Sequence, residues 1–223
     1  MLSALVSSLR QFGLFCTMGH YALRVVNTFT FFKVYEVMLF EHPLPQWTML
    51  DSRQQSRFLD LQEVLECCRE KDLDLNEAFV HYAFHKGDQC YAVFDGQRLA
   101  SYGWYSTRPT KIGACLQLSF APGYAYVYHG YTRPEYRGRR VQAVRATLAL
   151  IEQQRQGAKG VLSYIEADNF SAIRAAKRFN TRRIGRVIVI KLFGAYRIFH
   201  TRTCSDFGVQ VTVVKDARQG ETT

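Results

Sequence analysis

Hydrophobic and polar residues follow the periods of strands and helices along most of the chain. Short apolar or alternating runs predict β-strands, and apolar residues spaced three and four positions apart predict helices. In chain order, the pattern predicts the strand 32–41, the helices 51–69 and 75–85, the strands 90–94, 99–105 and 125–132, the helix 137–156, the strand 160–167, the helix 171–179 and the strand 187–193. An antiparallel β half therefore precedes a β-α-β-α-β half, which indicates the α+β, or mixed α/β, class around one sheet.

The first thirty residues are rich in Leu, Val and Phe, but polar residues interrupt them. Arg10, His20 and Arg24 leave no run close to the roughly 18 apolar residues that a spanning helix needs. No positively charged segment precedes the apolar part, as a secretory signal would require. The apolar spacing predicts an amphipathic helix or helix pair. We expect it to pack on the domain's own core; a second copy of the chain, giving a homodimer, and a membrane surface, giving peripheral attachment, are the alternative partners.

Composition describes a globular protein. The chain has 223 residues, of which 48% are hydrophobic and 22% charged, enough apolar material to bury a sizeable core. Its six cysteines form no CxxC pair and have no histidine at ligand spacing, so neither a zinc site nor any other metal site is expected. Cysteines without such partners are typical of free thiols in the reducing cytoplasm, and we expect the protein there.

The charge balance is the main clue from composition to function. The chain carries 29 Lys and Arg against 19 Asp and Glu, so its net charge is 29 − 19 = +10. Most of the arginines fall in the second half, which favours an anionic partner: a phosphorylated cofactor, an acidic carrier protein, a membrane face or nucleic acid. Because no RNP, helix-turn-helix or KH pattern occurs, nucleic acid is the least favoured of these partners.

The junction between the strand 125–132 and the helix 137–156 combines several features of an anion site. The strand ends before Pro134, and the segment Arg137-Gly-Arg-Arg140 leads into the helix. Backbone N–H groups at a helix start, together with the positive end of the helix dipole, bind phosphate groups. The junction therefore predicts a pyrophosphate site, with solvated arginines at a helix terminus as the alternative interpretation.

Two motifs resemble those of the GCN5-related N-acetyltransferase (GNAT) superfamily. The run Thr132-x-Pro134-x-x-Arg137-Gly138-x-x-Val141 resembles the acyl-CoA-binding motif of that family, which joins a strand to a helix. The segment that follows, from Ile165 through Asn169 to Phe179, resembles the strand and helix that complete its cofactor cleft. Both motifs occur in the expected order and in the expected elements. The resemblance covers residues 45–194, with residues 1–44 as an N-terminal extension that includes the first strand and residues 195–223 as a C-terminal extension.

The resemblance implies a single, mostly antiparallel sheet flanked by helices, with two central strands that splay apart. Acetyl-CoA or another acyl-CoA would lie between those strands, and a primary amine on a small molecule or polymer would attack the thioester directly. No metal takes part in this chemistry. The cofactor-binding positions that the resemblance assigns are Thr132, Arg133, Arg137, Gly138, Arg139, Arg140, Val141, Gln142 and Asn169.

The sequence departs from the family pattern at several positions. Arg140 and Gln142 stand where the family has its second and third glycines, and their side chains would either crowd the pyrophosphate or, for Arg140, contact it. Ala176 stands where many members carry a tyrosine that protonates the leaving thiolate. A water molecule or another tyrosine, such as Tyr128 or Tyr164, would have to replace it. A degenerate protein that binds acyl-CoA without catalysis is therefore an alternative.

The candidate catalytic residues are Tyr128, Glu166 and His129. Strand alternation places Tyr128, Gly130 and Thr132 on one face and His129 on the other, and a β-bulge would reverse this assignment. His129 is the residue type best suited to deprotonate an amine near neutral pH, and Glu166 is the second candidate base. Aminoacyl-tRNA and an acyl carrier protein are alternative donors on the same fold. Loops such as 107–120 are expected to choose the acceptor.

Overall fold

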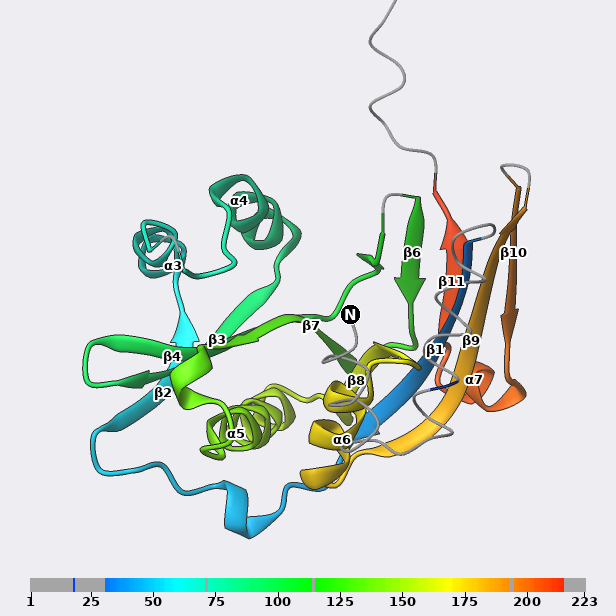
Figure 1. Cartoon of the computed structure of the whole chain (residues 1–223). Helices are drawn as coiled ribbons and strands as arrows, with labels where there is room; N and C mark the ends of the chain where they lie inside the picture. The colour runs from blue at the N-terminus through cyan, green and yellow to red at the C-terminus, as the bar shows by residue number, and fades with distance from the viewer. Residues whose placement is uncertain (1–17, 19–30, 71, 114, 193–194, 215–223) are drawn as a thin grey trace, which may run out of the picture.

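Eight strands form one large sheet in the computed structural model, which describes residues 18, 31–70, 72–113, 115–192 and 195–214 (Figure 1). The strand order is β10-β9-β1-β8-β7-β4-β3-β2. The β7–β8 pair is parallel, and the other neighbours are antiparallel. The mostly antiparallel sheet is confirmed. Its strands are β1 (Phe31–Phe40), β2 (Gln54–Leu59), β3 (Gln89–Asp95), β4 (Arg98–Ser106), β7 (Tyr124–Thr132), β8 (Gly160–Glu166), β9 (Arg182–Leu192) and β10 (Ala195–His200).

Helices cover both faces of the sheet. The helices α3 (Leu61–Cys67) and α4 (Glu77–Lys86) pack on one face of β3, β4 and β7, whereas α5 (Val141–Arg155) and α6 (Phe170–Arg178) pack on the opposite face (Figure 1). Local chemistry sets their ends: Asp60 and Glu63 form a capping box at the start of α3, and Gly87, with a φ of 89°, ends α4. Two 3₁₀ turns, Pro45–Trp47 and Pro134–Tyr136, begin with proline.

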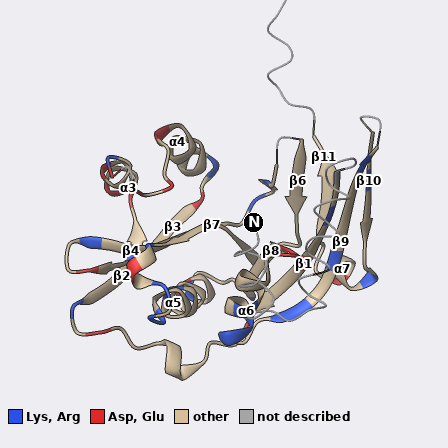
Figure 2. Ribbon diagram, viewed as in Figure 1, with Lys and Arg blue, Asp and Glu red and all other residues tan. Residues whose placement is uncertain are grey.

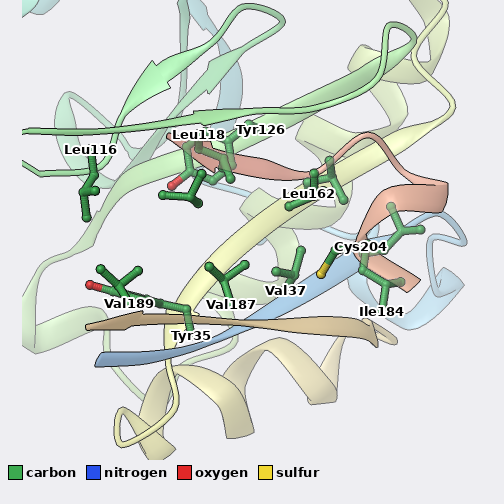
Figure 3. Close-up of a cluster of buried hydrophobic side chains, with 13 residues drawn as sticks. Tyr35, Val37, Leu116, Leu118, Tyr126, Leu162, Ile184, Val187, Val189 and Cys204 are labelled. Carbon is green, nitrogen blue, oxygen red and sulfur yellow. The ribbon is translucent and has the colours of Figure 1, made fainter. Parts of the chain in front are cut away.

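A second, small sheet covers the other end of the α3–α4 face. It contains β5 (Thr110–Lys111), β6 (Leu116–Ser119) and β11 (Gln210–Val213), in the order β11-β6-β5. Leu116 and Leu118 of β6 pack toward Val37 of β1 and other buried side chains of the large sheet (Figure 3). The short helix α7 (Arg202–Asp206) places Cys204 in the same core. The segment 107–120, predicted as a loop, is thus partly a strand pair.

The predicted helix 51–69 is wrong over its first half. Residues Gln54–Leu59 form β2, the edge strand, and the helix begins only at Leu61. The alternation that would reveal this strand is weak, because Gln54 and Ser56 are polar although they lie on the same half-buried side as Phe58. The Ser56 hydroxyl lies 3.0 Å from the hydroxyl of Tyr91 on β3. The helix predicted from residue 137 likewise begins at Val141, after the Arg/Gly turn.

Both predicted extensions contribute strands to the sheets. β1 lies between β8 and β9 and pairs with each of them, although β8 and β9 are close in sequence. β10 pairs with β9, and β11 pairs with β6. Residues 31–40 and 195–213 are therefore integral to the folded unit that contains residues 45–194. The helix predicted within the first thirty residues falls outside the described residues. In the described part of the chain, no helix is long and apolar enough to cross a membrane.

Candidate active site

The parallel strands β7 and β8 pair over only four residues and then separate. Residues 124–127 of β7 pair with residues 160–163 of β8. Beyond this point, a cavity of about 200 Å³ is lined by Tyr128 to Gly130 from one strand and Ser163 to Ile165 from the other. The splay that the resemblance implied is therefore present, and it opens toward the start of α5.

Two further cavities extend this opening along the α5–α6 face. One, of about 140 Å³, lies at the N-terminus of α5 beside Trp47, Gly138 and Arg178. The other, of about 530 Å³, lies between the end of β7 and the start of α6. Gln142 lines all three cavities, so together they form one cleft. Four arginines line the cleft, and none of the described residues that line it is an Asp or Glu: the arginines are Arg137, Arg140, Arg145 and Arg178.

The turn before α5 has the geometry of an anion site. Gly138 has a φ of 77° and Arg140 a φ of 68°, so two residues in the left-handed region turn the chain into the helix. No side chain caps the N-terminus of α5, which leaves its first N–H groups to a ligand or to water. The Arg140 guanidinium stacks 4.8 Å above the ring of Trp47. Arg140 thus lies at the side of this cavity and adds positive charge there.

The nine predicted cofactor positions divide into two groups. Seven of them line the cleft: Thr132, Arg137, Gly138, Arg140, Val141, Gln142 and Asn169. Asn169 also caps α6, because its Oδ1 accepts the N–H of Ala172 at 3.1 Å. Arg139 is exposed and does not line the cleft.

Arg133 has a structural role that the sequence did not reveal. Its side chain is 1% exposed and lies on the α3 side of the sheet, where its guanidinium pairs with Glu70 and Asp72. Its Nε donates to the carbonyl oxygen of Leu99 at 2.6 Å, and its backbone N–H donates to Ala100. These groups occupy the side chain and the amide, so the structure removes Arg133 from the predicted cofactor-binding set.

A β-bulge in β7 corrects the predicted face assignment. Tyr102 pairs with Tyr131 and Trp104 with Tyr128, so Gly103 alone lies opposite both His129 and Gly130. His129 has a φ of 45°, as expected at a bulge. The bulge turns Gly130 and Thr132 toward α5, whereas Tyr128 and His129 both contact Phe79 of α4. Tyr128 and His129 are therefore brought together rather than separated.

Hydrogen bonding ties Tyr128 to a buried charge pair. Its hydroxyl donates to the carboxylate of Asp88, which also pairs with Lys86 at 2.9 Å. Burial, followed by this bond to Asp88, raises the pKa of Tyr128. Burial lowers the pKa of Lys86, and Asp88 opposes that shift. A phenol whose proton is held by a carboxylate is a poor proton donor, so this geometry weakens the case for Tyr128 as the acid.

The two candidate bases lie in different surroundings. His129 lines the cavity between the strands, and its Nε2 lies 2.7 Å from the carbonyl oxygen of Asp74 and 3.5 Å from the Asp74 carboxylate. Because a carbonyl oxygen only accepts, Nε2 carries the proton and Nδ1 of the neutral ring keeps its lone pair. Glu166 pairs with Lys33 at 2.6 Å and does not line the described cavities.

Two tyrosines beside the cleft have free capacity for hydrogen bonding. The hydroxyl of Tyr164 is buried without a hydrogen-bond partner among the described residues, and Tyr164 lines the cavity between the strands. Burial raises its pKa, so the hydroxyl stays protonated. Its ring stacks on Tyr35 at a centroid distance of 4.0 Å. Tyr105, lining the same cavity, accepts a hydrogen bond from Arg145.

Arg145 is the site residue that sequence analysis missed. It is 4% exposed, lines two of the three cavities and donates from Nη1 to the hydroxyl of Tyr105 at 3.1 Å. The signal was present in the sequence. Arg145 lies four residues from Val141 and from Ala149, on the buried stripe of α5, where an apolar residue is expected.

Among the described residues, no group of three or more His, Cys, Asp or Glu side chains could hold a metal ion.

Comparison with known proteins supports the fold. Neither the models of protein families nor the curated proteins match the sequence. Among solved structures, similar ones include an acetyltransferase of the GNAT family from Colwellia psychrerythraea, with a TM-score of 0.50, 14% identity and coverage of 71% of this chain and 56% of that one. A GCN5-related N-acetyltransferase-like protein from Streptococcus suis 89/1591 has a TM-score of 0.50, 11% identity and coverage of 78% and 67%. The chain has the GNAT fold.

The likeness to GNAT structures is limited to part of each protein. A GNAT-family protein from Novosphingobium aromaticivorans is 23% identical over 70% of this chain, with a TM-score of 0.49, and the chain covers 62% of it. The chain thus spans less than two thirds of the length of two of these three structures.

Proposed function

We propose that the protein is an N-acyltransferase that moves the acyl group of an acyl-CoA, with acetyl-CoA as the simplest donor, to a primary amine. The observation that carries this proposal is the cleft, whose three adjacent cavities reach from the uncapped start of α5 to the gap between β7 and β8. Its arginine-rich end suits a pyrophosphate, and its interior end suits a thioester arm.

The cleft supplies a group for each step of direct attack. The bulge at His129 and Gly130 leaves backbone groups of β7 outside the ladder with β4, and we place the N–H that polarises the thioester carbonyl there. The amine nitrogen attacks the carbonyl carbon, the C–S bond breaks, and the ammonium proton passes to Nδ1 of His129, directly or through water. The hydroxyl of Tyr164 donates to the departing thiolate in place of the tyrosine that Ala176 replaces.

His129 is preferred to Glu166 as the base because of their neighbours. His129 lines the cavity and its imidazole is oriented by Asp74, whereas the carboxylate of Glu166 is held by Lys33. A carboxylate that is neutralised by a lysine resists accepting another proton. Glu166 therefore serves as the matched control for His129.

A thiol-release assay with acetyl-CoA and a panel of primary amines tests this proposal. We expect His129→Gln to lower turnover by roughly 10²–10⁴-fold, as for a lost general base, with CoA affinity retained, and Glu166→Gln to stay within a few-fold of the wild type. Equal losses in both variants, or full activity of His129→Gln, would reject His129 as the base. Clear CoA binding without turnover of any amine would favour the degenerate, non-catalytic alternative.

An acyl carrier protein or aminoacyl-tRNA donor is less well supported. The cleft continues past the strands to the turn at Gly138, where Trp47, Arg140 and Arg178 surround a cavity of about 140 Å³. A CoA pyrophosphate would occupy that cavity.

Basic residues also continue outside the cleft along α6 and the adjoining end of β9 (Figure 2). Of these, Arg183 and Arg186 pair with the buried carboxylate of Glu36, and Arg182 pairs with Glu41.

A further inference from the structure

Arg145 is a buried cation for which the described residues supply no counter-ion. Its only hydrogen bond among them runs from Nη1 to the neutral hydroxyl of Tyr105, and no Asp or Glu of the described chain lies within ion-pair distance. A guanidinium keeps its charge under physiological conditions, so it cannot escape the cost of burial by losing a proton. Buried charges in proteins are normally paired, because an unpaired one loses its hydration without compensation.

The fold makes room for this guanidinium with two glycines. A Cβ atom on Gly103 would lie 2.9 Å from Cζ of Arg145, and one on Gly130 would lie 3.6 Å from Nη2. The two glycines face each other across the bulge of β4 and β7. A side chain at Gly103 would displace the guanidinium, so these two glycines leave the space that it occupies.

The unsatisfied edge of the guanidinium has the geometry of a carboxylate receptor. Nε is buried and has no hydrogen-bond partner, and Nη2 makes no hydrogen bond with the described residues. Nε and Nη2 lie on the same edge of the planar group, and two parallel N–H groups on one edge bind a carboxylate in a bidentate manner. Nη1, on the other side, is held by Tyr105 and fixes the orientation of that edge.

We propose that Arg145 receives a carboxylate at the far end of the acyl group, so that the preferred donor is a dicarboxylic acyl-CoA. This inference rests on the proposed function. That function places the thioester carbonyl at the bulge, and Nη2 of Arg145 lies beside Gly130 of the same bulge. Arg145 also lies on the α5 side of the sheet, which the cofactor occupies, whereas His129 and Tyr128 lie on the α4 side. A carboxylate on the acyl group therefore fits better than one on the acceptor.

Calorimetric titration in the absence of acceptor tests the proposal with two donors of matched shape. Succinyl-CoA carries a terminal carboxylate, and 4-methylpentanoyl-CoA carries an isopropyl group of similar size in its place. We expect the wild type to bind succinyl-CoA roughly 10- to 100-fold more tightly than its neutral counterpart, as for a charge-assisted pair in a buried site. In Arg145→Met this ratio should fall to about one, and in Gly103→Ala it should fall because the added methyl group displaces the guanidinium.

Each other outcome overturns the proposal. If the wild type binds succinyl-CoA and 4-methylpentanoyl-CoA with similar affinity, the proposal is overturned whether or not the variants fold. A preference for β-alanine over propylamine as acceptor that disappears in Arg145→Met would assign the carboxylate to the acceptor instead. A loss of turnover with acetyl-CoA in Arg145→Met, without any wild-type preference for succinyl-CoA, would assign Arg145 to the thioester oxygen. Failure of CoA itself to bind would overturn the proposed function as well, whereas binding of CoA without the preference overturns only this inference.

Discussion

A single substitution in the turn before α5 separates cofactor binding from stability. Gly138 has a φ of 77°, and a Cβ built on it meets no atom within 4 Å. Gly138→Asp therefore adds backbone strain of about 1 kcal/mol without a clash inside the protein. The new carboxylate would point into the position proposed for the pyrophosphate. Two like charges roughly 4 Å apart repel by about 1 kcal/mol in water and by about 4 kcal/mol near a protein surface. This repulsion corresponds to about a 5- to 1000-fold loss of CoA affinity.

Gly157 provides a matched control on the same helix. It has a φ of 94° and likewise no atom within 4 Å of a built Cβ, so Gly157→Asp should cost a similar amount of strain. It follows the C-terminus of the 15-residue helix α5, about 22 Å from the turn, where its charge is screened from the cofactor. We expect melting temperatures about 2–4 °C below the wild type for both variants.

Calorimetry and thermal unfolding with added CoA measure the two effects separately. A ligand at 100 times its dissociation constant stabilises the folded state by about 2.7 kcal/mol, so the wild type and Gly157→Asp should both gain several degrees with CoA. Gly138→Asp should gain little or nothing. If Gly138→Asp bound CoA within twofold of Gly157→Asp, the turn would not be the pyrophosphate site.

Two further predictions concern residues that stabilise the fold. Arg133→Ala should lower the free energy of unfolding in urea by roughly 2–4 kcal/mol, because it removes a buried guanidinium and the bonds that it makes. Arg137→Ala, at an exposed position, should lower it by less than about 1 kcal/mol. Equal losses in the two variants would contradict the structural role of Arg133. The imidazole of His200 accepts the N–H of Val211 at 2.8 Å, and burial lowers its pKa below 6.5. The imidazole therefore binds a proton more readily in the unfolded chain than in the folded one, so stability should fall as the pH drops below 6.5. His200→Gln should flatten that part of the pH–stability curve. An unchanged curve would show that another group causes the fall.

The sequence predicted those parts of the cleft lining that depend on local chemistry. The turn at Gly138 and the start of α5 are set by a proline, a glycine and the helix end, which lie within a few residues of one another. Seven of the nine predicted cofactor positions accordingly line the cleft.

The directions of the arginines could not be predicted in the same way. Arg133 follows β7 directly and looked like part of the motif, but its side chain reaches Glu70 and Asp72, about sixty positions away in sequence. The bulge at His129 depends on the register between β4 and β7, and strand alternation alone cannot reveal it. Arg145 stands on the buried stripe of α5, yet only the packing of Gly103 and Gly130 around it shows its place in the cleft.

The fold was predictable in class but not in sheet order. The pattern of apolar residues located the strands β1, β3, β4, β7 and β8, part of β9, and the helices α4, α5 and α6. The edge strand β2 was missed because two of its half-buried positions, Gln54 and Ser56, are polar. The position of β1 between β8 and β9 depends on pairing between residues 31–40 and residues 160–192. Such long-range pairing leaves no local signal in the sequence.

The central claim is that the cleft between β7 and β8 binds CoA through its pyrophosphate and its thioester arm together. Calorimetric titration of the wild type with CoA and with pantetheine tests this claim most directly, because pantetheine lacks the nucleotide and its phosphates. We predict that CoA binds with a clearly higher affinity than pantetheine, and that raising the salt concentration narrows the difference. Equal affinities for the two compounds, or no binding of either, would contradict the claim.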